Sequence, residues 1–313
     1  MESNLRIVFF GTPGFAVATL KHLFEQNIEI AAVVTAPDKP SGRGLKLQSS
    51  EVKKFALAHD LPLLQPVSLK DQGFIDTLQS FRAQVFVVVA FRMLPHSVWS
   101  LPPLGTFNVH ASLLPAYRGA APIHWAIIRG ERKTGVTTFL LDDQIDTGKI
   151  LLQKECLIGP DETMGEIHDK LQILGAELAL NTLTGLKNNT LSPVVQKNIF
   201  ASHAPKLHRE NTYLDPSDSV ERWYNLYRGL TPFPGVLLHL SIEPSVDIKI
   251  GKCLINKNII SNISKIIKKQ DELFYSGPDG ALQLLEIQWP GKKMMPVADF
   301  LRGHSESIFN ESA

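Results

Sequence analysis

Short apolar runs alternate with longer amphipathic segments along the first part of the chain. Several of the runs have the length and the flanking turns of β-strands. They are residues 5–10, 28–35, 85–90, 106–110 and 135–141. The amphipathic segments between them include helix-start signals of the capping-box type, at Ser68 and at Thr163. Strands that alternate with helices predict an α/β fold of the Rossmann-like kind, with a mostly parallel sheet and helices on both faces.

The pattern changes after a long predicted helix at residues 163–186. The helix ends in a polar stretch at 187–190, and the sequence is irregular from there to Pro205. Short strand-like runs separated by turns follow, and they predict a small β-barrel. These runs are residues 247–250, 253–255, 273–275 and 281–288. We therefore divide the chain into a first domain at 1–188, a linker at 189–205 and a C-terminal domain at 206–313.

Composition places the chain among ordinary globular proteins. Apolar residues make up 44% of its 313 residues and charged residues 20%, a balance that argues against disordered and fibrous classes. The apolar run before Gly11 is too short for a signal peptide, and no later stretch has the length of a membrane span. We expect a cytoplasmic protein that makes no membrane contact.

Cysteine content and net charge narrow the chemistry. Cys156 and Cys253 are far apart and lack CxxC or neighbouring His spacing, so neither a disulfide framework nor a zinc site is expected. The net charge is +1, which means that any contact with nucleic acid must come from local basic patches.

The first strand-to-helix turn carries two glycines and a proline, at Gly11, Pro13 and Gly14. Backbone N–H groups at such a turn could meet an anion. The third glycine of a dinucleotide-binding fingerprint is missing, so a tight turn in a doubly wound sheet is the better interpretation.

Candidate chemistry begins at the predicted strand 106–110. Asn108 and His110 are two residues apart, so their side chains lie on one face while Val109 faces the packed layer. Both occupy the carboxyl end of the strand, where open α/β sheets bind ligands. A lone histidine in such a place is usually structural.

A carboxylate follows the next predicted strand. Asp146 would emerge beside His110 at the same edge, although Asp142 or Asp143 could be the reactive group instead. An amide, an imidazole and a carboxylate that meet at one edge suit acyl transfer.

Several stretches around these residues make the chain resemble the folate-dependent formyltransferases. The central ones are NVH at 108–110, SLLP at 112–115, YRGAAPI at 117–123 and IDTG at 145–148. Further matches are GTP at 11–13, FAV at 15–17, PDKPSGRG at 37–44, PG at 234–235 and PGKK at 290–293. The likeness runs nearly end to end and is greatest to the members that act on initiator methionyl-tRNA.

The resemblance implies transfer of a formyl group from 10-formyltetrahydrofolate to the α-amino group of initiator methionyl-tRNA. Asn108 and a protonated His110 would donate hydrogen bonds to the oxyanion, and Asp146 would favour the imidazolium and help to relay a proton. The folate is a co-substrate, and no metal is required. The C-terminal barrel would resemble an OB-fold, and we expect a monomer.

The resemblance also places the folate and the tRNA. Folate would bind along Ser112, Leu113, Leu114 and Pro115, along Phe91, Arg92, Met93 and Leu94, and at Asp142. The stretch 90–95 lacks the Tyr-Gly pair that is usual in the family. The tRNA would contact Arg43, Lys39, Lys46, Lys206, Lys292 and Lys293, with Arg302 as a further candidate. Arg43 lies between two glycines, so its loop can order on contact; without the resemblance, a solvated charged loop would be the better interpretation.

Two alternatives stay open at this point. A related enzyme could formylate a sugar amine or a purine-precursor amine, but such an enzyme would not need the Arg43 loop or the C-terminal barrel. A catalytically silent tRNA-binding or nucleotide-binding module could use the same scaffold, but Asn108, His110 and Asp146 argue against it.

Overall fold

A computed structural model describes residues 5–41, 46–240 and 245–303. The chain forms two compact units. The first consists of Met1–Pro122, Lys133–Leu157 and His168–Pro205. The second consists of Ile123–Arg132, Ile158–Ile167 and Lys206–Ala313, so two short pieces from the first half of the chain pack with the C-terminal part.

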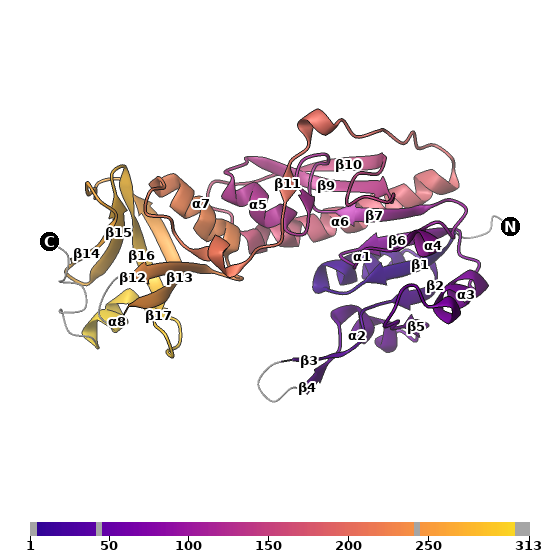
Figure 1. The fold of residues 1–313 in the computed structure, drawn as a ribbon, viewed down its shortest axis with the longest axis horizontal. Coiled ribbons are helices and arrows are strands. Elements are labelled where there is room, and N and C mark those ends of the chain that lie inside the picture. The colour runs from indigo at the N-terminus through magenta and orange to yellow at the C-terminus, as the bar shows by residue number, and fades with distance from the viewer. Residues whose placement is uncertain (1–4, 42–45, 241–244, 304–313) are drawn as a thin grey trace. The chain divides into compact units, whose positions relative to one another are not determined.

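A seven-stranded sheet forms the centre of the first unit (Figure 1). Its order is β10 (Ile150–Leu157), β9 (Lys133–Leu140), β7 (Thr106–His110), β6 (Val85–Val89), β1 (Arg6–Gly11), β2 (Glu29–Val34) and β5 (Leu63–Leu64). The five strands from β7 to β5 are parallel, whereas β9 and β10 are antiparallel to their neighbours. The predicted α/β class with a mostly parallel sheet is confirmed.

Helices cover both faces of this sheet. The helices of the first unit are α1 (Gly14–Glu25), α2 (Glu51–Ala58), α3 (Gln72–Ser80), α4 (His96–Trp99) and most of α6 (Met164–Lys187). On one face Phe74 of α3 and Val98 of α4 share an apolar cluster with Phe10 and Phe86 of the strands. On the other face Gly175 of α6 approaches Val109 of β7 closely, so a side chain there would have little room.

Two helix starts were predicted from capping boxes. At α6 the prediction holds, because Thr163 N–H donates to Glu166 Oε2 at 2.8 Å and Glu166 N–H donates to Thr163 Oγ1 at 3.4 Å. At α3 the predicted N-cap, Ser68, is three residues before the observed one. Asp71, not Ser68, caps the helix and accepts the Phe74 N–H at 2.9 Å.

The order of the strands fixes where a ligand can bind. From β1 the chain passes outward to β2 and β5, and then returns to β6 on the other side of β1. The sheet therefore changes direction between β1 and β6, and open α/β sheets bind ligands at the carboxyl ends of such strands. Gly11 ends β1 there, and a Cβ on it would lie 2.7 Å from Ala16 Cβ, so glycine is needed for the tight turn into α1.

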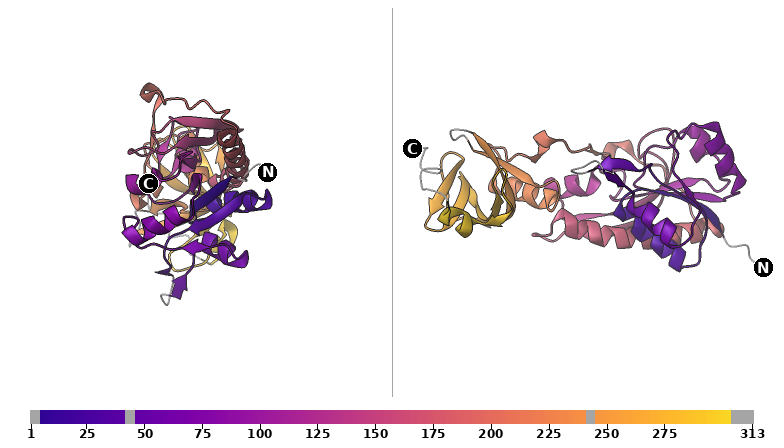
Figure 2. Two further views of the ribbon diagram at one scale, coloured as in Figure 1. Left: turned by 90° about the vertical axis from the view of Figure 1, so that its right-hand side faces the viewer. Right: turned by 90° about the horizontal axis from the view of Figure 1, so that it is seen from below.

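The second unit contains a curled antiparallel sheet, which the orange and yellow strands trace in Figure 2. Its strands are β12 (Val236–Leu240), β13 (Val246–Asn256), β16 (Gly280–Gln288), β15 (Glu272–Gly277) and β14 (Lys265–Lys269), with β17 (Met295–Pro296) paired to β16. Over the described residues no pairing joins β12 to β14, so the barrel-like sheet is open. The predicted runs 247–250 and 253–255 are one strand, whose register shifts between Ile250 and Cys253.

Residues from helices α7 and α8 complete the apolar core of the second unit. The second unit also holds α5 (Pro122–Ile128), which begins in the first unit, α7 (Val220–Leu230), α8 (Val297–Arg302) and the short helix η2 (Arg209–Thr212). Trp223 of α7 is fully buried, with its ring 4.6 Å from that of Tyr275. Cys253 lies in the same core, and burial raises the pKa of its thiol. It is a packed thiol rather than a reactive one.

Residues 189–205, which the pattern predicts as a linker, pack against the first unit. They include η1 (Asn198–Phe200) and β11 (His203–Ala204), and β11 pairs with β8 (Arg118–Gly119). Val194 forms a bridge to Ile150 of β10. Across the described ranges, no helix is long and apolar enough to cross a membrane.

Candidate active site

Asn108 and His110 lie at the carboxyl end of β7, beside the change of direction in the sheet. Asn108 is paired with Val88 of β6 in the parallel register, and Val109 faces α6, as the two-residue spacing predicts. The Asn108 side chain is half-buried and forms no hydrogen bond with any other described residue. Its amide N–H groups are therefore free to meet a ligand.

His110 is held in one orientation. The ring is buried, and its Nε2 lies 2.9 Å from the carbonyl oxygen of Tyr117. Because a carbonyl oxygen only accepts hydrogen bonds, Nε2 carries a hydrogen and Nδ1 is the ring nitrogen left for chemistry. Nδ1 faces Asp146, with Nδ1 and Oδ2 3.8 Å apart. That separation is too long for a direct hydrogen bond but close enough for the carboxylate to attract a protonated ring.

Asp146 is the carboxylate that faces His110. Its backbone has a left-handed φ of 57°, and its Oδ2 accepts the N–H of Gly119 at 2.8 Å. The two alternative carboxylates are placed differently. Asp142 accepts the Thr147 hydroxyl at 2.7 Å, and Asp143 is exposed.

A buried amide, which sequence reasoning missed, holds the Asp146 turn. Gln196 lies in the segment after α6, and its Nε2 donates to the carbonyl oxygens of Asp146 at 2.9 Å and Gly148 at 2.8 Å. Its Oε1 accepts from Arg118 Nε at 3.0 Å and from Arg118 Nη2 at 2.7 Å. Arg118 also donates to Asn198 Oδ1 at 3.1 Å. Residues 196–198 are therefore hydrogen-bonded both to Arg118 and to the turn at Asp146.

Gly119 shows why the turn after His110 needs glycine. Its φ is +126°, and a Cβ there would lie 2.6 Å from the carbonyl oxygen of Ala204. The close pairing of β8 with β11 brings the Gly119 N–H to Asp146.

The predicted folate residues that follow His110 are mostly packed inside the unit. Ser112 and Leu114 are buried. Ser112 Oγ donates to the Ala116 carbonyl at 2.6 Å, and the Leu114 N–H donates to Thr137 Oγ1 at 3.1 Å. Leu113 and Pro115 are half-buried. Of the four residues, Leu113 and Pro115 are therefore the two that keep some exposed surface.

The second group of folate candidates follows β6. Leu94 is buried in the apolar cluster on the α3 face, whereas Met93 is 60% exposed. The Phe91 ring packs edge-on against Phe10 at 5.7 Å, and the Arg92 guanidinium lies over the Phe91 ring. This loop thus presents apolar surface at the carboxyl end of β6, next to the end of β7.

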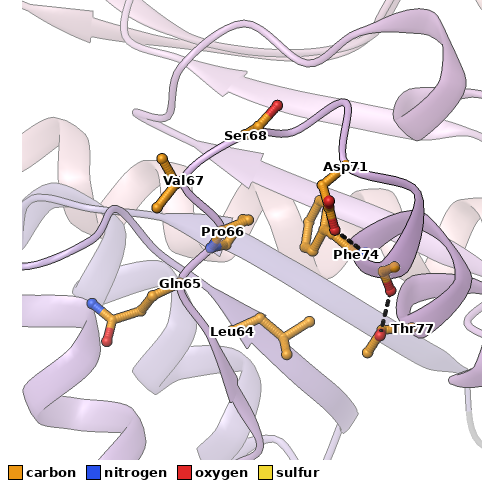
Figure 3. A pocket seen from close by; sticks show the side chains of 9 residues that line it. Leu64, Gln65, Pro66, Val67, Ser68, Asp71, Phe74 and Thr77 are labelled. Carbon is orange, nitrogen blue, oxygen red and sulfur yellow. Dashed lines mark hydrogen bonds between the residues drawn. The ribbon is translucent and has the colours of Figure 1, made fainter.

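A separate pocket of about 440 Å³ lies beside this loop (Figure 3). It is lined by Leu64, Gln65, Pro66, Val67, Ser68, Asp71, Gly73, Phe74 and Thr77. Arg92 fixes its rim by donating to the carbonyl oxygens of Pro66 and Val67. None of the three catalytic candidates lines it.

Two of the predicted tRNA residues of the first unit, Lys39 and Lys46, belong to the strands β3 (Lys39–Ser41) and β4 (Lys46–Gln48), which pair with each other (Figure 1). Lys39 is exposed and has no ion-pair partner in the described part of the chain. The Lys46 side chain and Arg43 lie outside the described residues. At the base of the hairpin, hydrogen bonds from Lys53 and Gln65 lower the pKa of Asp38, so Lys53 is occupied as an anchor.

The tRNA candidates of the second unit are exposed. Lys206, Lys292 and Lys293 have no ion-pair partner among the described residues. Arg302 is bound to Asp299, which leaves it less suited to a phosphate. Where the chain is described, no group of three His, Cys, Asp or Glu side chains is placed to hold a metal.

Two solved structures have folds similar to that of this chain. The HypX protein of Aquifex aeolicus, solved with tetrahydrofolic acid, superposes with a TM-score of 0.66 at 16% identity, covering 96% of this chain and 47% of that one. This chain thus spans about half the length of HypX. WlaRD, a sugar 3N-formyl transferase solved with dTDP and 5-N-formyl-THF, superposes with a TM-score of 0.67 at 19% identity. The match covers 93% of this chain and 100% of that one.

Sequence comparison is more specific. The formyl transferase family model matches residues 5–183, and that of the formyl transferase C-terminal domain matches residues 206–305. A methionyl-tRNA formyltransferase of Flavobacterium johnsoniae is 46% identical over 96% of both chains. One of Bacteroides thetaiotaomicron is 42% identical, again over 96% of both. The chain belongs to the formyl transferase family.

Proposed function

We propose that this protein transfers the formyl group of 10-formyltetrahydrofolate to the α-amino group of initiator methionyl-tRNA and so makes N-formylmethionyl-tRNA. The observation that carries the proposal is the meeting of Asn108, His110 and Asp146 at one strand edge, in a chain of this family. The names of the full-length relatives support the choice of acceptor. The folates in the titles of the related solved structures support the choice of donor.

The amine nitrogen attacks the formyl carbon, and the carbonyl oxygen becomes an oxyanion. Asn108 has amide N–H groups with no other partner, so it can meet that oxygen as the charge develops. One donor placed in this way typically lowers the barrier by about 3 kcal/mol. The bond from the formyl carbon to N10 of the folate then breaks, and N10 leaves with a proton.

His110 transfers that proton, and Asp146 assists it. With Nε2 bound to the Tyr117 carbonyl, Nδ1 is the atom that can take the proton of the attacking amine and pass it to N10. Asp146, 3.8 Å away, compensates the positive charge on the ring while it holds the proton. A protonated Nδ1 can also donate to the oxyanion, and a water can bridge the gap to the carboxylate.

The folate would lie across the carboxyl ends of β6 and β7. Phe91 and Met93 would offer apolar surface to the pterin, and Pro115 and Asp142 would contact the folate as the resemblance implies. The buried Ser112, Leu114 and Leu94 would shape the site from beneath.

The tRNA would be bound by basic residues outside the catalytic edge. We assign this role to Lys39, Lys46 and Arg43 of the first unit and to Lys206, Lys292 and Lys293 of the second. Residues 1–188 would form the catalytic domain and 206–313 the tRNA-binding domain, joined through 189–205. The protein would act as a monomer in the cytoplasm, where its tRNA substrate is used.

A direct acceptor comparison tests the proposal. The protein is incubated with labelled 10-formyltetrahydrofolate and with charged initiator tRNA, charged elongator tRNA or free amino sugars. Label should appear on the initiator methionyl-tRNA, and the His110→Ala variant should transfer little. Faster transfer to an amino sugar, or none to methionyl-tRNA, would contradict the proposed acceptor.

A further inference from the structure

Phe233 is an aromatic side chain with little packing of its own. It is 74% exposed, in the loop between α7 and β12. A single exposed apolar side chain is common on protein surfaces, so the surroundings of Phe233 decide whether it marks a binding site.

The loop holds Phe233 in place. Pro232 and Pro234 flank it and restrict the backbone. The Thr231 hydroxyl donates to the Tyr227 carbonyl at 2.8 Å, and the Gly235 N–H donates to the Leu230 carbonyl at 2.8 Å. The ring is therefore displayed on a loop that is already ordered, which reduces the entropy lost when a partner binds.

A lysine lies directly beside this loop. Gly235 has a φ of +88°, and a Cβ on it would collide with Cε of Lys249 on β13, so the Lys249 side chain lies over Gly235. Lys249 has no carboxylate partner in the described part of the chain. The side chain of Lys249 thus lies over Gly235, and Gly235 is two residues along the chain from the exposed Phe233 ring.

A loop with two further lysines lies beside the same face of the sheet. Ile248 and Ile250 point into the core, so Lys249 points outward, and it is paired with Gln288 of β16. Gln288 Nε2 donates to the Lys292 carbonyl at 2.9 Å, which holds the loop of Lys292 and Lys293 next to this face. We call Phe233, Lys249, Lys292 and Lys293 the aromatic–basic face.

Acidic residues nearby do not neutralise these lysines. Asp247 shares the outward face but is bound by Tyr213, His239 and Arg209. Glu286 is opposite Lys252 in the pairing of β13 with β16, and among the described residues it forms no ion pair with Lys249, Lys292 or Lys293. The face therefore keeps a positive charge around an exposed ring.

We infer that the aromatic–basic face binds an unpaired nucleotide of the tRNA, with Phe233 stacked on its base and Lys249 at its phosphate. Aromatic rings stack on bases that are not enclosed in a duplex, and unpaired lysines bind the adjoining backbone. The inference rests on the proposed function and assigns it two residues, Phe233 and Lys249, that the sequence did not single out.

Binding and formyl transfer are measured separately to test it. Fluorescence anisotropy gives the Kd for charged initiator tRNA at several salt concentrations, for the wild type, Phe233→Ala, Phe233→Trp and Lys249→Gln. Ile263→Ala is the control for an exposed apolar side chain, since Ile263 is 63% exposed in the same unit. Lys257→Gln is the control for charge, since Lys257 is paired with Glu221.

Phe233→Ala should raise Kd about tenfold, and Phe233→Trp should keep or improve affinity, because stacking depends on the ring. Lys249→Gln should lower the slope of log K against log salt by about 0.7 to 0.9. Wild-type Kd and slope in Phe233→Ala and Lys249→Gln would overturn the inference, as would equal losses in both controls. A wild-type protein that binds the tRNA without formylating it would instead contradict the proposed function and leave this inference standing.

Discussion

The side chains of His110 and Asp146 near the end of β7 are largely buried and hydrogen-bonded, whereas the lysines of the aromatic–basic face are exposed or half-exposed and have no ion-pair partner among the described residues. At β7, His110 is 6% exposed, one ring nitrogen is bound to a carbonyl, and Asp146 is held by Gly119 and Gln196. On the aromatic–basic face, Phe233 and three lysines stand exposed or half-exposed without partners. The first arrangement suits groups that must be in place before a charge develops, and the second suits charges that must stay available to a partner from solution.

The difference predicts that changes at β7 alter the rate of transfer and changes on the face alter affinity. Buried polar groups also depend on one another more than exposed ones do, because a buried group that loses its partner costs about 1–3 kcal/mol. Variants in both regions test this contrast.

Asn108→Ala and His110→Ala should each reduce kcat by about 10²-fold or more, because each removes a group that acts on the oxyanion or the transferred proton. Single-turnover transfer and the Kd for tRNA should be measured side by side. The Kd should stay within about twofold of the wild type. Near wild-type turnover in either variant would remove that residue from the mechanism.

Asp146→Asn should lower kcat by about 10- to 100-fold with the fold preserved, because the amide keeps the shape of the turn but loses the charge beside Nδ1. Circular dichroism checks the fold, and Asp143→Asn is the matched control, since Asp143 is exposed in the same loop. A greater loss in the control would move the role to Asp143.

Gln196→Glu should lower kcat by about tenfold with little change in KM for tRNA. The glutamate can still accept from Arg118, but its oxygens cannot donate to the carbonyls of Asp146 and Gly148, so the Asp146 turn loses its support. Asn198→Ala removes only the outer end of the network and should have a smaller effect. Equal kcat in the wild type and Gln196→Glu would show that the Asp146 turn keeps its conformation without the hydrogen bonds from Gln196.

Asp247→Asn should have the smallest effect, and it should be on stability. Hydrogen bonds from Tyr213, His239 and Arg209 lower the pKa of Asp247, so its stabilisation is present above the ordinary carboxyl pKa. As the pH falls below about 4, through the lowered pKa, that stabilisation is lost.

Urea unfolding should therefore show a loss of about 1 kcal/mol or less at pH 7 in Asp247→Asn, and a smaller difference from the wild type at pH 3. The exposed Asp271→Asn should change neither value. A difference that grows towards pH 3 would contradict the assigned direction of the pKa.

The end of β7 could be predicted because its information is local. A buried strand, a two-residue spacing and the strand's carboxyl end place Asn108 and His110 together without any knowledge of the rest of the fold. Strand β10 was missed because half of its side chains are exposed at a sheet edge, which weakens the apolar pattern.

Gln196 could not be found in this way. It meets Arg118 across 78 positions of the chain, within a segment whose composition indicates only an irregular linker. The aromatic–basic face was missed for a similar reason, because Phe233 and Lys249 come together through the turn at Gly235 and the pairing of β12 with β13.

The central contrast is tested most directly by one paired measurement on two variants, His110→Ala and the double variant Phe233→Ala/Lys249→Gln. For each, the Kd for charged initiator tRNA and the single-turnover rate of formyl transfer at saturating tRNA are determined. For His110→Ala we expect a wild-type Kd and a rate reduced about 10²-fold. For the double variant we expect a Kd raised about tenfold or more and a near wild-type rate. Two variants that change the same quantity would contradict the division between chemistry and recognition.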